Sequence, residues 1–321
     1  MEATSTAPKT LQDAIIYFAD ADNCLNFLAA RRWPNGVTCP TCGSNDVGFI
    51  SSRRIWQCRT RHDHSQFSIK TGTIFEDSPI SLNKWLLGMW MLANCKNGVS
   101  SYEISRATGI SQKSTWFMLQ RLRLAMQDSD TGGKLAGEVE VDETFIGGKA
   151  RNMHKDVKAR RITGTGPEGK AIVAAVLQRG GKVRAKVMST RRKPELQALV
   201  RDHVEFNAAL YSDALKSYDG LSEDYQHQVV DHALEYVREN VHTNGLENFW
   251  SLLKRSINGT YISVEPFHLF RYVDEQAFRF NNRKDMTDSD RFDLAVRQIV
   301  GRRLTWAEVT GKVEEKPEAV N

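Results

Sequence analysis

The sequence predicts an α/β protein in which a mixed-sheet domain follows two small N-terminal modules. Three observations lead to this prediction. Four of the five cysteines lie within residues 1–78, in a segment rich in turn-forming residues. Residues 79–127 have the apolar spacing of helices. From residue 135 onward, strand-like and helix-like segments alternate, which is typical of a sheet covered by helices.

Length and composition indicate a globular protein of more than one domain. The chain has 321 residues, of which 40% are hydrophobic and 26% charged, and its net charge is +5. No apolar run reaches the roughly 20 residues that a membrane-spanning helix needs. The first residues lack the pattern of a secretion signal. We therefore expect a cytoplasmic protein with no membrane partner, whose mild positive charge permits a nucleic-acid partner without requiring one.

The first module, residues 1–78, contains a predicted zinc ribbon at about residues 37–70. Cys39 and Cys42 lie three positions apart in the segment CPTCG. The tight turn between them lets both thiolates reach one Zn²⁺. Gly43 follows at a position where a left-handed backbone is often needed.

Cys58 is the third candidate zinc ligand, and the fourth is expected to be His62 or His64. No second cysteine stands at the spacing that would pair with Cys58, so the predicted site is Cys₃His. A redox-active pair of Cys39 and Cys42 is the alternative. Four protein ligands leave no open position on the metal, so the expected zinc is structural and not catalytic.

The second module, residues 79–130, is predicted to be a helix-turn-helix. Two helical periods meet at Gly109, and Ser111 is a candidate N-cap for the second helix. A short helix, a turn with glycine and a second helix form the motif that reads DNA in many proteins; a generic helical hairpin is the alternative. Five residues of the second helix are the expected DNA contacts: Gln112, Lys113 and Ser114 for bases, and Arg121 and Arg123 for phosphates.

The third module, residues 135–284, carries paired carboxylates. A strand containing Asp142 precedes a hairpin centred on Gly180 and Gly181, an amphipathic helix, and a buried strand that ends at Asp213. This order of elements is the opening of an RNase H-like sheet, in which the first strand neighbours the strand after the first helix. Asp142 and Asp213 are therefore expected to lie close together.

A later helix supplies the remaining candidates for a catalytic site. Close carboxylates repel each other, and a divalent metal removes that cost. The helix starts near Asn244, carries Glu247 in its first turn, and places Lys254 two turns further on the same face, where it is expected to contact the DNA backbone. Three acidic neighbours of Asp142 are interpreted as strand-face or turn residues: Glu138, Glu140 and Glu143. Of these, Glu143 is the one that could assist the site.

Together these segments resemble insertion-sequence transposases of the DDE, RNase H-like superfamily, in the ISXO-like subgroup with an N-terminal zinc ribbon. The resemblance extends over roughly residues 15–284, through CPTCG, QFSIKTGTIFEDSPI, VEVDETFIGGK, LYSDALKSY, HTNGLENFWSLLKR and DEQAFRFNNR. It implies DNA strand cleavage and strand transfer with Mg²⁺ or Mn²⁺. It further implies that Asp142 and Asp213 are the first two metal ligands and Glu247 the third. Because some relatives have asparagine as the third catalytic residue, Asn244 is the alternative.

The expected function is that of a transposase acting on double-stranded DNA, at the terminal repeats of its element and at target DNA. The resemblance also implies a homo-oligomer on DNA, located at the nucleoid. Residues 285–321 are expected to form a helical appendage with a disordered acidic tail. The alternatives are a nuclease that cuts without joining, a zinc-ribbon and helix-turn-helix DNA-binding regulator, and an inactive transposase copy.

Overall fold

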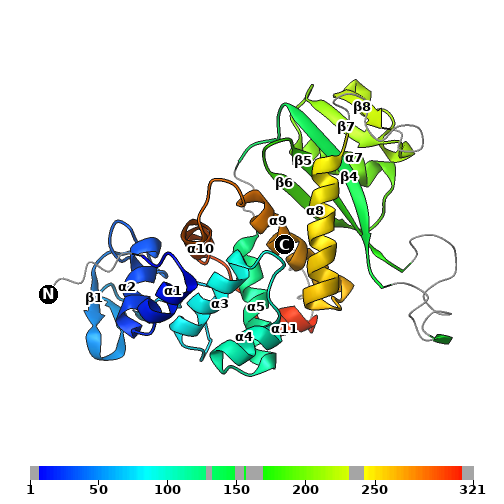
Figure 1. Ribbon diagram of the computed structural model, residues 1–321. Coiled ribbons are helices and arrows are strands. Elements are labelled where there is room, and N and C mark those ends of the chain that lie inside the picture. Colours follow the sequence, from blue (N-terminus) through cyan, green and yellow to red (C-terminus); the bar gives the residue numbers. More distant parts are fainter. Residues whose placement is uncertain (1–6, 128–131, 149–154, 157–168, 231–241, 313–321) are drawn as a thin grey trace. The chain divides into compact units, whose positions relative to one another are not determined.

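The computed structural model describes residues 7–127, 132–148, 155–156, 169–230 and 242–312 (Figure 1). The chain forms two compact units, Met1–Gln127 with Asp285–Asn321, and Asp128–Lys284. Both helices and a mixed sheet are present, which confirms the α/β class. The predicted tail at residues 313–321 lies outside the described residues. Within the described ranges, no helix combines the length and the apolar character needed to cross a membrane.

The first unit begins with two capped helices and a small sheet. A capping box of Thr10 and Asp13 starts α1 (Leu11–Phe18), and the Asp20 side chain accepts N–H groups at the start of α2 (Ala21–Arg32). The antiparallel sheet has the order β1-β2-β3, with bounds Val47–Ile50, Ile55–Cys58 and Gln66–Phe67. Strands this short bury little apolar surface by themselves, so the sheet needs further crosslinks to be stable.

Three helices follow in the first unit: α3 (Leu82–Asn94), α4 (Ser101–Thr108) and α5 (Gln112–Met126). A capping box of Ser100 and Glu103 begins α4, which ends at Gly109 with a φ of 68°, in the left-handed region that favours glycine. The Ser111 hydroxyl accepts the Ser114 N–H and starts α5. The two predicted helices and the turn at Gly109 are therefore confirmed.

The C-terminal helices α10 (Asp288–Arg297) and α11 (Trp306–Thr310) pack within the first unit. The Phe292 ring lies against Trp90 and Phe27, with centroid distances of 4.9 and 5.6 Å. The expected helical appendage, as far as residue 312, therefore packs into the core of the first unit. The sequence shows the apolar face of α10 but not the surface that covers it.

The structure corrects the expectation for Arg121 and Arg123. Arg121 is 6% exposed, and its guanidinium donates to the carbonyl oxygens of Leu304, Ile74 and Glu76 at 2.8, 3.1 and 2.7 Å. Arg123 is 1% exposed. The prediction that both contact DNA phosphates is wrong, because α5 is covered on several sides and these arginines serve the interior of the unit.

The second unit is built on a five-stranded mixed sheet. Its elements are β4 (Glu138–Ile146), β5 (Ala171–Gln178), β6 (Val183–Met188), α7 (Lys193–His203), β7 (Ala209–Asp213), β8 (Gln226–Val230), α8 (Asn244–Arg255) and α9 (Leu269–Asn281). The strand order is β6-β5-β4-β7-β8. β4, β5 and β6 pair antiparallel through the predicted hairpin, whereas β7 pairs parallel with both β4 and β8. The predicted neighbourhood of β4 and β7 is thereby confirmed.

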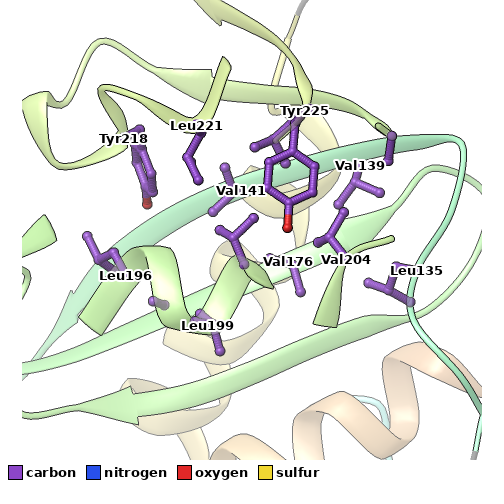
Figure 2. Packing of buried hydrophobic residues seen from close by; sticks show 14 residues of the cluster. Leu135, Val139, Val141, Val176, Leu196, Leu199, Val204, Tyr218, Leu221 and Tyr225 are labelled. Carbon is purple, nitrogen blue, oxygen red and sulfur yellow. The ribbon is translucent and has the colours of Figure 1, made fainter. Parts of the chain in front are cut away.

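Apolar side chains cover both faces of this sheet. On one face, Val139 and Val141 of β4 pack with Leu196 and Leu199 of α7 (Figure 2). On the other face, residues of β5 such as Val173 pack with α8 and α9. Side chains of a strand alternate between faces, so Glu140 and Asp142 lie on the face that α8 covers.

Arg121→Ala is expected to lower the free energy of unfolding by about 2–3 kcal/mol, because it leaves buried carbonyl oxygens without donors. Urea unfolding of the full chain measures the change. Arg303→Ala is the matched control, since Arg303 pairs with Asp77 while 57% exposed and should contribute less than about 1 kcal/mol. Equal losses for the two variants would contradict the structural role of Arg121.

Candidate functional site

The predicted zinc ligands gather into one cluster beside the small sheet. The ligand atoms of Cys39, Cys42, Cys58 and His62 all lie within 4.8 Å of one another. Cys39 Sγ is 3.4 Å from His62 Nε2, and Cys42 Sγ is 3.6 Å from Cys58 Sγ. His62 is therefore the fourth member of the set, whereas His64 does not belong to it.

The backbone around the cluster favours the thiolate of Cys39 and orients the ring of His62. Burial by itself would raise the pKa of the Cys39 thiol, but the N–H groups of Cys42 and Thr41 outweigh it and lower that pKa to about 6, which favours the thiolate. His62 Nδ1 lies 2.6 Å from the Asp63 carbonyl oxygen, which requires the proton on Nδ1 and leaves Nε2 facing the sulfurs. Ligand number and type fit Zn²⁺ in a closed structural site.

A second site is indicated where β4 and β7 run side by side. Glu140 pairs with Tyr211 in the parallel register, and two further residues on each strand lead to Asp142 and Asp213. Neighbouring strands lie about 4.8 Å apart, and residues at equivalent positions share a face. Asp142 and Asp213 therefore lie on the same face of the sheet, where the Asp213 carboxylate is close enough to raise the pKa of Asp142.

Burial dominates the electrostatics of Asp142. It raises the pKa of this carboxyl from an ordinary value of 3.8 to about 7, and the Glu143 and Asp213 carboxylates act in the same direction. The Trp250 indole N–H of α8 opposes the shift by donating to Oδ2 at 2.8 Å. A carboxyl that burial and like charges hold partly neutral gains strongly from a nearby cation. Carboxylate oxygens are the ligands that Mg²⁺ and Mn²⁺ prefer, so this donor set fits such an ion.

Glu143 lies next to Asp142 but on the opposite side of the strand. Its Oε2 accepts the hydroxyl of the buried Tyr218 at 2.8 Å. Burial raises the pKa of Glu143, and Asp213 adds to the effect, while Tyr218 and Arg191 lower it. Glu143 thus raises the pKa of Asp142, in keeping with the expectation that it is the acidic neighbour able to assist the site.

The predicted residues of α8 are exposed along that helix. Glu247 lies in the first turn with Asn244, and Lys254 lies in the last turn. Across the described ranges, the Cys/His cluster is the one group of three or more candidate ligands within 4.8 Å of each other. The structure therefore brings Asp142 and Asp213 to one face and does not draw Glu247 into a tight group with them.

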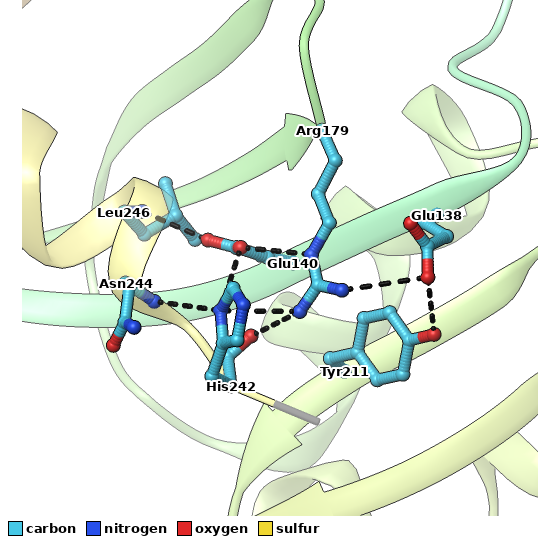
Figure 3. A network of polar contacts seen from close by, with 7 residues as sticks. All are labelled: Glu138, Glu140, Arg179, Tyr211, His242, Asn244 and Leu246. Carbon is cyan, nitrogen blue, oxygen red and sulfur yellow. Dashed lines mark hydrogen bonds and ion pairs between the residues drawn. The ribbon is translucent and has the colours of Figure 1, made fainter. Parts of the chain in front are cut away.

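A polar network that sequence reasoning missed surrounds Glu140 (Figure 3). Arg179 donates Nε to Glu140 Oε1 at 3.1 Å, Nη1 to Glu138 Oε1 at 3.4 Å, and Nη2 to the His242 carbonyl oxygen at 2.8 Å. The Tyr211 hydroxyl also donates to Glu138, at 2.9 Å. The available signal was the period of two along the strand, which places Glu140 on the same face as Asp142.

The three predicted base contacts lie at the start of α5. Gln112 donates its side-chain amide to Ser101 Oγ at 2.9 Å, and Lys113 Nζ lies 5.0 Å from the ring centroid of Trp306. Lys113 and Ser114 are exposed. Their contacts with bases remain a prediction.

Two segments of the chain match known families. Residues 134–281, which contain the β4–β7 site, match the ISXO2-like transposase domain. Residues 19–61, which include Cys39, Cys42 and Cys58, match the transposase zinc-ribbon domain. These two segments of the chain belong to the ISXO2-like transposase and transposase zinc-ribbon families.

Two relatives agree with this membership. The transposase is 28% identical over 249 residues to an uncharacterized protein in transposable element ISH50 of Halobacterium salinarum, covering 74% of this chain and 83% of the relative. It is also 28% identical over 102 residues to an uncharacterized transposase-like protein of Haemophilus influenzae, covering 32% of this chain and 82% of the relative.

His62→Ala is expected to remove zinc from the transposase, whereas His64→Ala should keep about one zinc ion per chain. Elemental analysis of the purified proteins measures the metal. The melting temperature of His62→Ala should also fall, because the small sheet loses its crosslink. Equal zinc contents in the two variants would show that the fourth ligand is misassigned.

The raised pKa of Asp142 also predicts a pH dependence of stability without added Mg²⁺ or Mn²⁺. The folded state holds this proton more tightly than the unfolded chain, so the free energy of unfolding should fall as the pH rises from about 4 to about 7. Melting temperatures between pH 5 and pH 8 should therefore change less in Asp142→Asn than in the wild type. Glu247→Gln, at an exposed carboxylate, should keep the wild-type slope. If the melting temperatures of wild type and Asp142→Asn changed equally with pH, the raised pKa of Asp142 would be refuted.

Proposed function

We propose that this transposase catalyses metal-dependent DNA strand cleavage and strand transfer at the ends of an insertion sequence. The observation that carries the proposal is the shared face of Asp142 and Asp213 on adjacent parallel strands, inside the segment that matches the transposase domain. Water attacks a phosphodiester at the element end, and the bond to the 3′ oxygen breaks. The freed 3′ hydroxyl then attacks a target phosphodiester, and no covalent intermediate with the protein is needed.

The sheet supports an RNase H-like catalytic domain over residues 135–284. Its order β6-β5-β4-β7-β8, with antiparallel pairing on one side of β4 and parallel pairing on the other, matches that proposal. Helices cover both faces. In this arrangement the central strand and its parallel neighbour carry the first two acidic residues.

Three carboxylates are proposed to hold the divalent metal: Asp142, Asp213 and Glu247. When bound, Mg²⁺ or Mn²⁺ would activate water and stabilise the charge of the leaving oxygen. Trp250 holds one oxygen of Asp142 in place. Asn244 is the alternative third residue, and Lys254 would contact the DNA backbone from the exposed side of α8.

DNA recognition is assigned to the first unit. The zinc ribbon near residues 37–70 would support or contact the element end, and the helix pair in residues 79–130 would read bases through Gln112, Lys113 and Ser114. Lys113 and Ser114 are exposed, as such contacts require. Joining two element ends would require a homo-oligomer on double-stranded DNA, and this substrate would place the protein at the nucleoid.

The test incubates the purified full-length protein with Mn²⁺ and labelled DNA that carries the ends flanking its own gene. Wild type should cut at the element end and join the product to target DNA. Asp142→Asn and Asp213→Asn should bind the same DNA and cut undetectably, because each removes one ligand charge. The scissile position is read on a sequencing gel.

Other outcomes of this experiment would favour other functions or refute the site. Cleavage without joining favours a nuclease. Binding without cleavage by wild type favours a DNA-binding regulator or an inactive copy. Cleavage by Asp213→Asn at the wild-type rate would refute the site.

A further inference from the structure

We propose that Glu140 is a positioning residue, which caps helix α8 from strand β4 and thereby sets where Glu247 lies along the sheet. The inference rests on the proposed function, in which Glu247 contributes the third carboxylate. It assigns a role to a side chain that does not touch the DNA or the metal itself.

Glu140 is buried between two hydrogen-bond donors. Its side chain is 1% exposed. Oε1 accepts Arg179 Nε at 3.1 Å, and Oε2 accepts the backbone N–H of Leu246 at 2.9 Å. His242 Nδ1 lies 3.5 Å from Oε1. A buried carboxylate is retained only where such partners compensate its lost hydration, so the position and the orientation of Glu140 are both tightly defined.

The backbone donor to Glu140 lies in the first turn of α8. Thr243 is the N-cap residue of α8, but its side chain makes no capping hydrogen bond. The N–H of Leu246, the third residue of the helix, would ordinarily bond to such a cap. Glu140 takes that place from another element (Figure 3), and its negative charge lies at the positive end of the helix dipole.

Two contacts join α8 to β4 at matching intervals along the helix and the strand. The Leu246 N–H donates to Glu140, and the Trp250 indole N–H donates to Asp142. The two donors are four residues apart on α8, and the two acceptors are two residues apart on β4. Four helical residues advance about 6 Å, and two strand residues advance about 6.6 Å. The two contacts therefore hold α8 along β4 in a single register, with Glu247 between them.

Gly245 permits this close approach. A Cβ at this position would lie 2.7 Å from Glu140 Oε2 and 2.4 Å from Leu177 Cδ2. Both distances are shorter than non-bonded atoms tolerate, so a side chain here would displace the Glu140 carboxylate, the Leu177 side chain or the start of α8. Three successive residues at the start of α8 thus have complementary roles. Gly245 allows the close approach, Leu246 donates its N–H to Glu140, and Glu247 carries the exposed carboxylate.

Glu138 is a natural control for the charge of the network. It lies on the same strand and pairs with the same Arg179, but it is 44% exposed and its other partner is Tyr211 of β7. Glu138 makes no hydrogen bond to α8 among the described contacts. Changing it perturbs Arg179 without removing the cap.

The experiment compares wild type, Glu138→Gln, Glu140→Leu, and Glu140→Leu combined with Arg179→Met, all as full-length proteins. The double variant keeps the interior apolar and avoids an unpaired buried arginine, so it should fold even where the single variant does not. Three quantities are measured: the rate of end cleavage at saturating DNA over a range of Mn²⁺ concentrations, the affinity for end DNA, and hydrogen exchange of the peptide at residues 243–250.

The double variant should cleave about 10- to 100-fold more slowly and need more Mn²⁺, as expected when a residue that supports a metal ligand is lost. Its 243–250 peptide should exchange several-fold faster, while its melting temperature and DNA affinity stay close to wild type. Glu138→Gln should match wild type in all three measurements. This pattern separates positioning from a general structural role. If Glu140 only stabilised the fold, the double variant, which avoids the unpaired buried arginine, would cleave at the wild-type rate.

Other results overturn the inference. A folded double variant with wild-type cleavage and exchange would show that α8 does not need Glu140. A loss of cleavage that follows an equal loss of DNA affinity would assign Glu140 to DNA binding instead. A wild type that does not cleave with Mn²⁺ would overturn the proposed function itself, and the positioning role with it.

Discussion

The burial of strand β4 on both faces is the constraint on which the second unit depends. Val139 and Val141 take the face of α7, which leaves Glu140 and Asp142 on the face of α8. Two carboxyl groups are thereby carried into an interior that penalises their charge. The protein meets this penalty in two ways: Glu140 receives an arginine and a backbone N–H, whereas Asp142 receives an indole N–H and keeps a pKa of about 7. Glu140, whose charge has two hydrogen-bond partners, is suited to a structural role. Asp142, whose charge is less well compensated, is suited to binding a metal ion.

The two candidate metal centres differ in how the chain builds them. Cys39, Cys42, Cys58 and His62 come from one short stretch, and turns and a hairpin suffice to bring them together. Their soft sulfur ligands suit zinc in a closed site. Asp142 and Asp213 meet only because β4 and β7 pair in parallel across an intervening hairpin and helix. Their oxygen ligands suit a hard cation that leaves room for a substrate. The first centre fits the stabilisation of a small module, and the second is the one that we propose for catalysis.

The positive charge of an arginine does not by itself identify a DNA contact in this protein. Arg121 and Arg179 are both largely buried and serve hydrogen-bond acceptors inside their own units. In the first unit, Arg121 joins α5 to carbonyl groups of residues 74–76 and to Leu304, which helps to hold the C-terminal segment in place. A guanidinium has five N–H donors, so it can bond to carbonyl oxygens from several segments of the chain at once. Basic residues on a predicted DNA-binding helix are thus not automatically DNA contacts.

The sequence is sufficient to predict the local features: the cysteine motif, the helix pair around Gly109, the hairpin at Gly180 and the mixed α/β class. Each depends on spacing or turn chemistry within a short stretch, which the residues themselves encode. It also placed the strands of Asp142 and Asp213 side by side, because the order of elements constrains sheet topology. Three outcomes required the three-dimensional packing of the chain: His62 and not His64 joins the cluster, Arg121 is buried, and Glu140 caps α8. These outcomes depend on which surfaces cover each other, and periodicity shows that a face is apolar without showing what packs against it.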